Sequence, residues 1–171
     1  MSEALARLLA GGRHNRLAII GTPPPGLAIG ETAHFERVVR LLRPGETAVA
    51  GAAIADPLRL PVVEALFDRL LVTSVVPPTT ARAELRELWR IMSPAALALL
   101  VVKARRPWQF GAAGWQEDDL KPVIEGVMFE VLDWQVETIP DRHHLILVGK
   151  RDGLRPAEIG AVQASEGLAT A

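Results

Sequence analysis

The sequence predicts an α/β fold: a three-layer sandwich built on a mostly parallel sheet that ends in an antiparallel hairpin. Short apolar runs alternate with segments of helical spacing, which is the pattern of parallel β–α units. The last two apolar runs are separated only by TIPDRHH, a link short enough for an antiparallel pair. With 171 residues, 49% of them hydrophobic, the chain can bury the core of one domain. We expect this domain to span residues 1–152, with an N-terminal helix and link at 1–15 and a flexible tail at 153–171.

The first half of the chain alternates between the two periodicities. The N-terminal leucines share one face of a short helix that Gly11-Gly12 ends, and the apolar run at 16–20 predicts the first strand. Residues 31–42 are predicted to form a helix that Pro44-Gly45 stops, and residues 47–54 a second strand. The helical stripe in 31–42 consists of Phe35, Val38, Val39 and Leu42.

The second half is patterned more clearly. Residues 67–76 predict a buried strand, which Pro77-Pro78 ends, and Thr80 can then cap a helix that runs to about Met92. A buried strand at 97–102 follows, and a third helix starts at Asp119, with Pro122 in its first turn. The predicted hairpin consists of strands at 130–137 and 145–149.

Charge and composition exclude several classes of function. The net charge is −1 and like charges form no block, so we expect no nucleic-acid partner. Cysteine is absent, which excludes disulfides and cysteine-bound metals. No apolar run reaches the roughly 20 residues of a membrane span, so we expect a cytoplasmic protein without a membrane partner.

The stretch IIGTPPPGLAIGE, residues 19–31, occupies the usual place of a nucleotide-cofactor loop, between a strand and a predicted helix. Gly21 and Gly26 have the spacing of a phosphate loop, but Leu27-Ala28 replaces the lysine and hydroxyl residue that such a loop needs. The three prolines between them remove backbone N–H groups that could bind an anion. Phosphate binding is therefore not expected.

The middle of the chain resembles the class I S-adenosylmethionine-dependent methyltransferases. An acidic residue precedes an aliphatic-proline pair and a hydrophobic-Asp strand start, as Asp56, Leu60-Pro61 and Phe67-Asp68 do here. The helix ELWRIMSPAA and the strand LALLVV also match the family's pattern, and Met128-Phe129 stands where the family often has Gly-Phe. The resemblance covers roughly residues 16–150 and implies a Rossmann-like sheet. It also implies a cofactor site at Gly21, Gly26 and Asp56, if that site is retained.

The cofactor motifs of the family are altered in this sequence. Proline fills the centre of the loop where the family has Gly-x-Gly-x-Gly, and the predicted second strand at 47–54 carries no acidic residue for the ribose. About ten residues separate Pro44-Gly45 from Asp56, which indicates that one β–α unit is missing or collapsed. Pro94-Ala95-Ala96 replaces the family's Pro-Gly-Gly.

Other chemistry-bearing residues favour structural roles. Adjacent strand residues point to opposite faces, so His143 and His144 are not expected to share a metal ion. His34 is expected as a half-exposed residue of the helix at 31–42, and Glu117-Asp118-Asp119 as helix-capping acids. The loop RRPWQFGAAGW is either a lid packed on its own domain or a surface for a substrate or partner. Its candidate interface residues are Arg105, Arg106, Trp108, Phe110 and Trp115.

Two hypotheses follow for the function. In the first, the chain is a pseudoenzyme, a methyltransferase-like protein with a degenerate site that is non-catalytic or poorly catalytic. Such a site binds either no cofactor or S-adenosylmethionine. The chain then acts through protein contacts, as a homodimer or as the partner of an active enzyme. In the second, it is a small active methyltransferase that binds S-adenosylmethionine through an unusual loop, with Asp56 at the adenine. Another small ligand in the same crevice is a third interpretation.

Overall fold

Strands dominate the part of the chain that the structure describes. This computed structural model describes residues 3–73, 78–106, 108 and 113–152, which form seven strands and three helices. In chain order these elements are α1 (Glu3–Leu9), β1 (Arg16–Ile20), β2 (Arg37–Leu42), β3 (Ala52–Ile54), β4 (Phe67–Val72), α2 (Ala81–Ile91), β5 (Met92–Lys103), α3 (Glu117–Glu125), β6 (Phe129–Ile139) and β7 (Asp141–Lys150).

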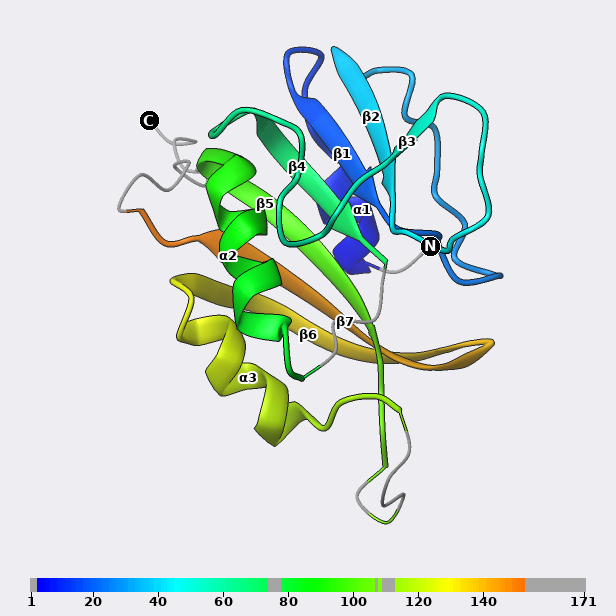
Figure 1. Cartoon of the computed structure of the whole chain (residues 1–171), viewed down its shortest axis with the longest axis vertical. Coiled ribbons are helices and arrows are strands. Elements are labelled where there is room, and N and C mark those ends of the chain that lie inside the picture. Colours follow the sequence, from blue (N-terminus) through cyan, green and yellow to red (C-terminus); the bar gives the residue numbers. More distant parts are fainter. Residues whose placement is uncertain (1–2, 74–77, 107, 109–112, 153–171) are drawn as a thin grey trace, which may run out of the picture.

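All seven strands belong to one sheet with the order β3-β2-β1-β4-β5-β7-β6 (Figure 1). The neighbouring pairs β3–β2, β2–β1, β1–β4 and β4–β5 are parallel. Strand β7 pairs antiparallel with both β5 and β6. Leu17 of β1 is paired with Val38 of β2 on one side and with Arg69 of β4 on the other. The predicted Rossmann-like sheet with a C-terminal hairpin is confirmed.

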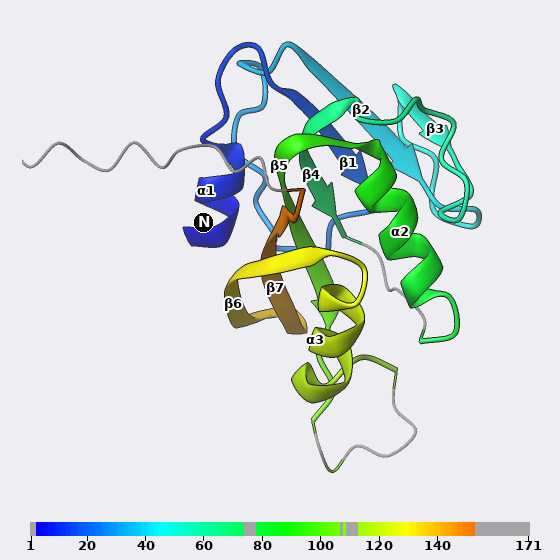
Figure 2. The same ribbon diagram turned by 90° about the vertical axis from the view of Figure 1, so that its left-hand side faces the viewer.

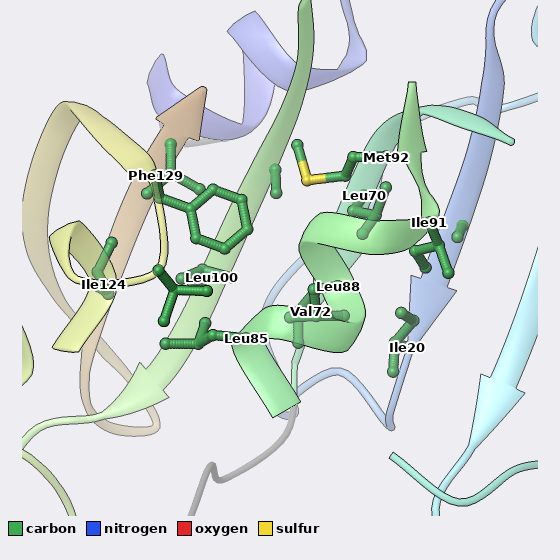
Figure 3. Close-up of a cluster of buried hydrophobic side chains, with 14 of the residues drawn as sticks. Ile20, Leu70, Val72, Leu85, Leu88, Ile91, Met92, Leu100, Ile124 and Phe129 are labelled. Atoms are coloured by element: carbon green, nitrogen blue, oxygen red, sulfur yellow. The ribbon is translucent and has the colours of Figure 1, made fainter. Parts of the chain in front are cut away.

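Helices cover both faces of the sheet, so the predicted three layers are present. Helices α2 and α3 lie on one face and the short helix α1 lies on the other (Figure 2). The α2 and α3 face buries the larger core, in which Phe67 and Phe129 are fully enclosed. Figure 3 shows part of this core, where Leu85 and Leu88 of α2 lie near Val72 and Leu100 of the sheet. The α1 face buries a smaller core, to which α1 contributes Leu5, Leu8 and Leu9.

The helix predicted for residues 31–42 is wrong. Residues 37–42 form β2, which pairs along its length with β1. Residues 37–42, RVVRLL, also fit a strand, since the run is short and has two adjacent β-branched valines followed later by two leucines. His34 is consequently an exposed turn residue, and its Nε2 lies 3.0 Å from the carbonyl oxygen of Leu9.

The β–α unit that was expected to be missing or collapsed is present as a strand without its helix. Strands β1, β2 and β3 are all present, but the strand predicted at 47–54 is reduced to Ala52–Ile54 and is the third, not the second. The fully described connections 21–36, 43–51 and 55–66 contain no helix. The chain has therefore kept the strands of this half and lacks the helices between them.

The second half follows the prediction closely. Helices α2 and α3, the strand within β5 and the final hairpin all lie where the sequence placed them, with β4 ending earlier, at Val72. Two positions where the resembled family has glycine adopt left-handed backbone: Ala95 has φ 59° and Met128 has φ 68°. This conformation is costly for a residue with a Cβ, which explains the family's preference for glycine.

Candidate functional site

The proline-containing loop leaves the carboxyl end of β1 and crosses to the α1 face. The Gly21 N–H donates to the Leu41 carbonyl (2.8 Å), with a left-handed φ of 85° at the glycine. Gly26 has φ 97°, and a Cβ there would lie 3.2 Å from Cγ2 of Ile139 at the hairpin tip. Leu27 is buried in the α1-side core. The loop is thus anchored by its apolar residues against the sheet.

Glu46 was not singled out from the sequence, yet its carboxylate connects the ends of β1 and β2. Its Oε1 accepts the Thr22 N–H (3.0 Å) and its Oε2 accepts the Arg43 N–H (2.7 Å). The predicted second strand at 47–54 begins directly after Glu46 and contains no acidic residue. With β2 ending at Leu42, Glu46 is the acid near its carboxyl end.

Arg43, the first residue after β2, forms an ion pair with Glu84 of α2. The exposed fractions of the two side chains are 18% for Arg43 and 4% for Glu84. The Glu84 carboxylate also accepts the hydroxyl hydrogen of Thr80 (2.7 Å). Because a buried carboxylate needs such partners, this pair fixes α2 against the end of β2.

The space between these elements is nearly filled. A cavity of about 10 Å³ remains at the carboxyl ends of β1 and β4, where a parallel sheet of this topology has its ligand crevice. That volume holds about one water molecule, whereas ligand pockets measure roughly 300–1,000 Å³. The cavity is lined by Ile20, Arg43, Pro57, Leu60, Val72, Glu84 and Leu88.

The connection 55–66 closes the crevice from the side of α2. The Leu60 N–H donates to Oε1 of Glu87 (2.7 Å), and Arg90 donates to the carbonyl oxygens of Val62 (3.0 Å) and Leu60 (3.2 Å). Glu87 and Arg90 are themselves paired, and the hydrogen bond from Arg90 lowers the pKa of the Glu87 carboxyl. Two side chains of α2 therefore hold this connection in place.

Asp56, the residue expected at an adenine, is exposed and stabilises its own turn. Its Oδ1 accepts the Leu58 N–H (2.9 Å), a local pattern that aspartate favours in turns. Its neighbour Pro57 lines the small cavity, as does Ile20 before Gly21. Gly21 and Asp56 therefore flank the crevice, while Gly26 lies against Ile139 of the hairpin.

A second cavity, of about 310 Å³, lies beyond the carboxyl end of β5 and is lined in part by Arg105, Trp115 and Asp119. Arg105 contacts Asp119 (3.4 Å), and Arg106 lies 5.5 Å from the ring centre of Trp108, which is 66% exposed. Trp115 is a core residue with only 6% exposure, so its ring does not belong to an exposed surface. Phe110 lies outside the described residues.

Histidine 144 is a buried structural residue. Its Nδ1 accepts the Trp134 indole N–H (3.0 Å), so Nε2 carries the proton and donates to the Trp115 carbonyl (3.0 Å). Burial lowers the pKa of His144, although the bond to Trp115 opposes this shift. Its neighbour His143 is bonded to the Asp141 carbonyl instead (2.9 Å). In the described part of the chain, no cluster of histidine and acidic side chains could hold a metal ion.

The acidic run Glu117-Asp118-Asp119 forms the first turn of α3, where negative charge favours the helix dipole. The N-cap is Gln116 rather than Asp119.

Among the described residues, no helix is long and apolar enough to cross a membrane.

Comparison with solved structures shows the fold class. The chain has the fold of the class I S-adenosylmethionine-dependent methyltransferases. It is similar to a putative methyltransferase from Bacillus halodurans (TM-score 0.62, 12% identity, 87% of this chain and 99% of that chain). No protein-family profile matches the sequence, and neither does any curated protein.

Two further similar structures contain a ligand or a partner. One is the 1,6-didemethyltoxoflavin-N1-methyltransferase of Burkholderia thailandensis with bound S-adenosylhomocysteine (TM-score 0.61, 17% identity, 87% of this chain and 77% of that chain). The other is a putative methyltransferase of Haloferax volcanii in complex with the Trm112 methyltransferase activator (TM-score 0.59, 14% identity, 86% of each chain).

S-Adenosylmethionine does not fit the crevice of this chain as its side chains stand. Between the described residues, the cavity at the ends of β1 and β4 measures about 10 Å³, which is far smaller than the ligand. A cation, Arg43, follows β2, and both carboxylate oxygens of Glu46 already accept backbone N–H groups. The prolines between Gly21 and Gly26 leave few N–H groups for a carboxylate. The crevice therefore lacks both the volume and the hydrogen-bonding groups that S-adenosylmethionine would need.

Proposed function

We propose that this chain is a non-catalytic member of the methyltransferase fold that acts through contacts with other proteins. One observation carries the proposal: the Arg43–Glu84 ion pair stands in the crevice at the ends of β1 and β4. A ligand there would have to displace Arg43 and leave the carboxylate of Glu84 buried without its charged partner. Removing a partner from a buried ion pair costs about 3–5 kcal/mol, which a ligand's binding energy would have to exceed.

The connection 55–66 adds to this barrier. Leu60 and Pro57 line the same small cavity, and the segment is tied to α2 through Glu87 and Arg90. Opening the crevice therefore requires several hydrogen bonds to break together. We infer that the altered loop, the ion pair and the tied connection are parts of one rearranged, closed end of the sheet.

A protein partner has support from one similar structure. The Haloferax volcanii methyltransferase is found in complex with an activator protein, so a chain of this fold can form such a complex. A homodimer is the other form that protein contact could take. Light scattering of the purified chain distinguishes them, since a homodimer doubles the mass at high concentration.

A second candidate is an active small methyltransferase, which Glu46 favours. Its carboxylate lies near the carboxyl end of β2, where the family expects an acid for the ribose hydroxyls. In this function Asp56 would contact the adenine after the connection 55–66 had moved.

Titration calorimetry with S-adenosylmethionine and S-adenosylhomocysteine tests both candidates, with thermal shift as an independent readout. We expect neither heat of binding nor a change in Tm at millimolar ligand. Micromolar binding that Glu46→Gln and Asp56→Ala both weaken would overturn the non-catalytic assignment in favour of the methyltransferase. Arg40→Gln serves as the control, because Arg40 is an exposed residue of β2 outside the crevice.

A further inference from the structure

Helix α2 carries a row of side-chain donors that no residue in the described part of the chain uses. Arg82, Arg86 and Trp89 are spaced i, i+4 and i+7, which places them along one side of the helix. Arg82 and Arg86 are exposed and have no ion pair or hydrogen bond within the described residues. The Trp89 Nε1–H is buried and has no acceptor there. Arg82 and Arg86 therefore leave two charges available to acceptors from outside, whereas the buried Trp89 N–H is out of a partner's reach.

The row borders a groove of about 300 Å³ between α2 and the turn that follows α3. Arg86 and Trp89 form one wall, and Gly126, Val127 and Met128 form the other. The guanidinium of Arg82 lies nearby, since a Cβ on Gly126 would be 3.1 Å from its Nη2. We call these residues, Arg82, Arg86, Trp89, Gly126, Val127 and Met128, the α2 groove.

The Trp89 ring is held in position from the side of β7. The ammonium of Lys150 lies 4.0 Å from the ring centre and donates to the Met92 carbonyl (2.6 Å). The Lys150 ammonium therefore has its hydrogen-bond acceptor inside the protein, and its contact with the ring holds Trp89, which forms one wall of the groove. A rigid tryptophan beside arginines is the composition of an interface hot spot.

The conformation and exposure of Met128 indicate that it contacts a partner rather than stabilises the fold. Its φ of 68° is left-handed, a conformation in which a non-glycine residue costs roughly 1–2 kcal/mol. The side chain does not offset this cost by burial, because it is 52% exposed, whereas Phe129 beside it is fully buried. A strained, exposed, apolar residue next to a groove is typical of a binding surface.

We propose that the α2 groove binds an acidic amphipathic segment of a partner protein. Two carboxylates of the segment pair with Arg82 and Arg86, and an apolar side chain inserts between Trp89 and Met128. The helix rises about 6 Å from Arg82 to Arg86 and about 10 Å from Arg82 to Trp89. Carboxylates at i and i+4 of a partner helix, with an apolar residue at i+7, therefore match the row. Charge complementarity selects this partner, because the two exposed groups of the row, Arg82 and Arg86, are both cations. This inference rests on the proposed action through protein contacts and names the surface.

The test uses the full-length chain and a fluorescently labelled helical peptide. The peptide has glutamates at two positions i and i+4 and leucine at i+7, and a matched peptide has glutamine in place of both glutamates. We expect the acidic peptide to bind by anisotropy with a Kd of about 10–100 μM and the glutamine peptide about tenfold more weakly. Arg86→Glu should weaken the acidic peptide about tenfold and Trp89→Phe about fivefold. Arg40→Glu, a charge reversal on β2, should leave binding unchanged.

Met128→Gly separates binding from folding. Glycine adopts left-handed backbone without strain, so this variant should raise Tm by about 2 °C and yet weaken the acidic peptide about fivefold. Weakening with a raised Tm cannot come from unfolding. Equal binding of both peptides, or equal weakening by Arg86→Glu and Arg40→Glu, would overturn the proposal.

Two other occupants give distinct results, and either one overturns the assignment of an acidic partner. A doubled mass in light scattering that Met128→Gly abolishes would show that a second copy of the chain fills the groove. Stronger peptide binding after Glu158→Gln with Glu166→Gln would show that carboxylates of the chain's own C-terminal segment compete for it. Calorimetry with S-adenosylmethionine tests the proposed function separately, so either proposal can fail alone.

Discussion

The ion pair between Arg43 and Glu84 makes an asymmetric prediction about stability. Glu84 is nearly enclosed, with 4% of its side chain exposed, whereas Arg43 keeps 18% exposed. Arg43→Ala leaves a buried carboxylate that, among the described residues, keeps the hydrogen bond from the Thr80 hydroxyl. Glu84→Leu instead leaves an arginine whose long side chain can turn its charge toward water.

The expected magnitudes follow from this difference in burial. Breaking a buried pair by removing one partner costs about 3–5 kcal/mol, and the remaining Thr80 hydrogen bond puts Arg43→Ala near 3 kcal/mol. For a domain of this size that loss lowers Tm by about 6–12 °C. We expect Glu84→Leu to cost about 1–2 kcal/mol. The double variant Arg43→Met with Glu84→Leu should lie within about 1 kcal/mol of the wild type, because both charges leave together.

Urea denaturation followed by circular dichroism measures these free energies of unfolding. Arg40→Ala is the matched control on β2, since this arginine is exposed and should change stability by less than about 0.5 kcal/mol. The reasoning fails if Arg43→Ala costs less than about 1 kcal/mol. It also fails if the double variant loses the sum of the two single losses, because the residues would then act independently.

Three further outcomes are expected. Ala95→Gly should stabilise the chain by about 0.5–1 kcal/mol in urea denaturation, because Ala95 holds a left-handed φ of 59°, and a loss would mean that its Cβ packing outweighs the strain. Gly114→Ala should destabilise it by about 2 kcal/mol or more, since φ is +123° and a Cβ would lie 2.9 Å from the Lys103 carbonyl oxygen; an unchanged Tm would contradict this. Burial lowers the pKa of His144 below its usual 6.5, so the unfolded chain binds more protons and stability should fall as pH drops below about 6.5, by at most about 1.4 kcal/mol per pH unit. His144→Gln, but not His143→Gln, should remove this slope in denaturation curves measured at several pH values.

The parts of the fold that could be predicted are those with long, unambiguous patterns. Helix α2 combines an apolar face with charged residues on the other side, and the apolar run in β5 is buried on both sheet faces. Residues 37–42 show no such clear pattern. Over so short a length, RVVRLL is compatible with both the helical and the strand periodicity. Pairing with β1 decided the outcome, and that contact is not visible in the sequence.

The error at β2 also determined what was missed in the site. With the second strand predicted at 47–54, Arg43 and Glu46 fall in the connection before it, and no pattern in the sequence indicates a role for them in the site. The altered glycine loop was visible directly, since proline at 23–25 is a local fact. The closure of the crevice depends on Arg43 meeting Glu84, 41 positions later, and a single sequence does not indicate such a pair.

The lack of helices between β1 and β4 has a consequence for how the molecule opens. Strand β3 has three residues at the sheet edge, and Ile54 is 60% exposed, so little apolar area holds this side closed. Strands β4 and β5, in contrast, lie between two cores. Amide hydrogen exchange should therefore slow progressively from β3 toward β5, because local opening needs less free energy where fewer apolar contacts break. One end of a continuous sheet then fluctuates while the other behaves as a rigid platform.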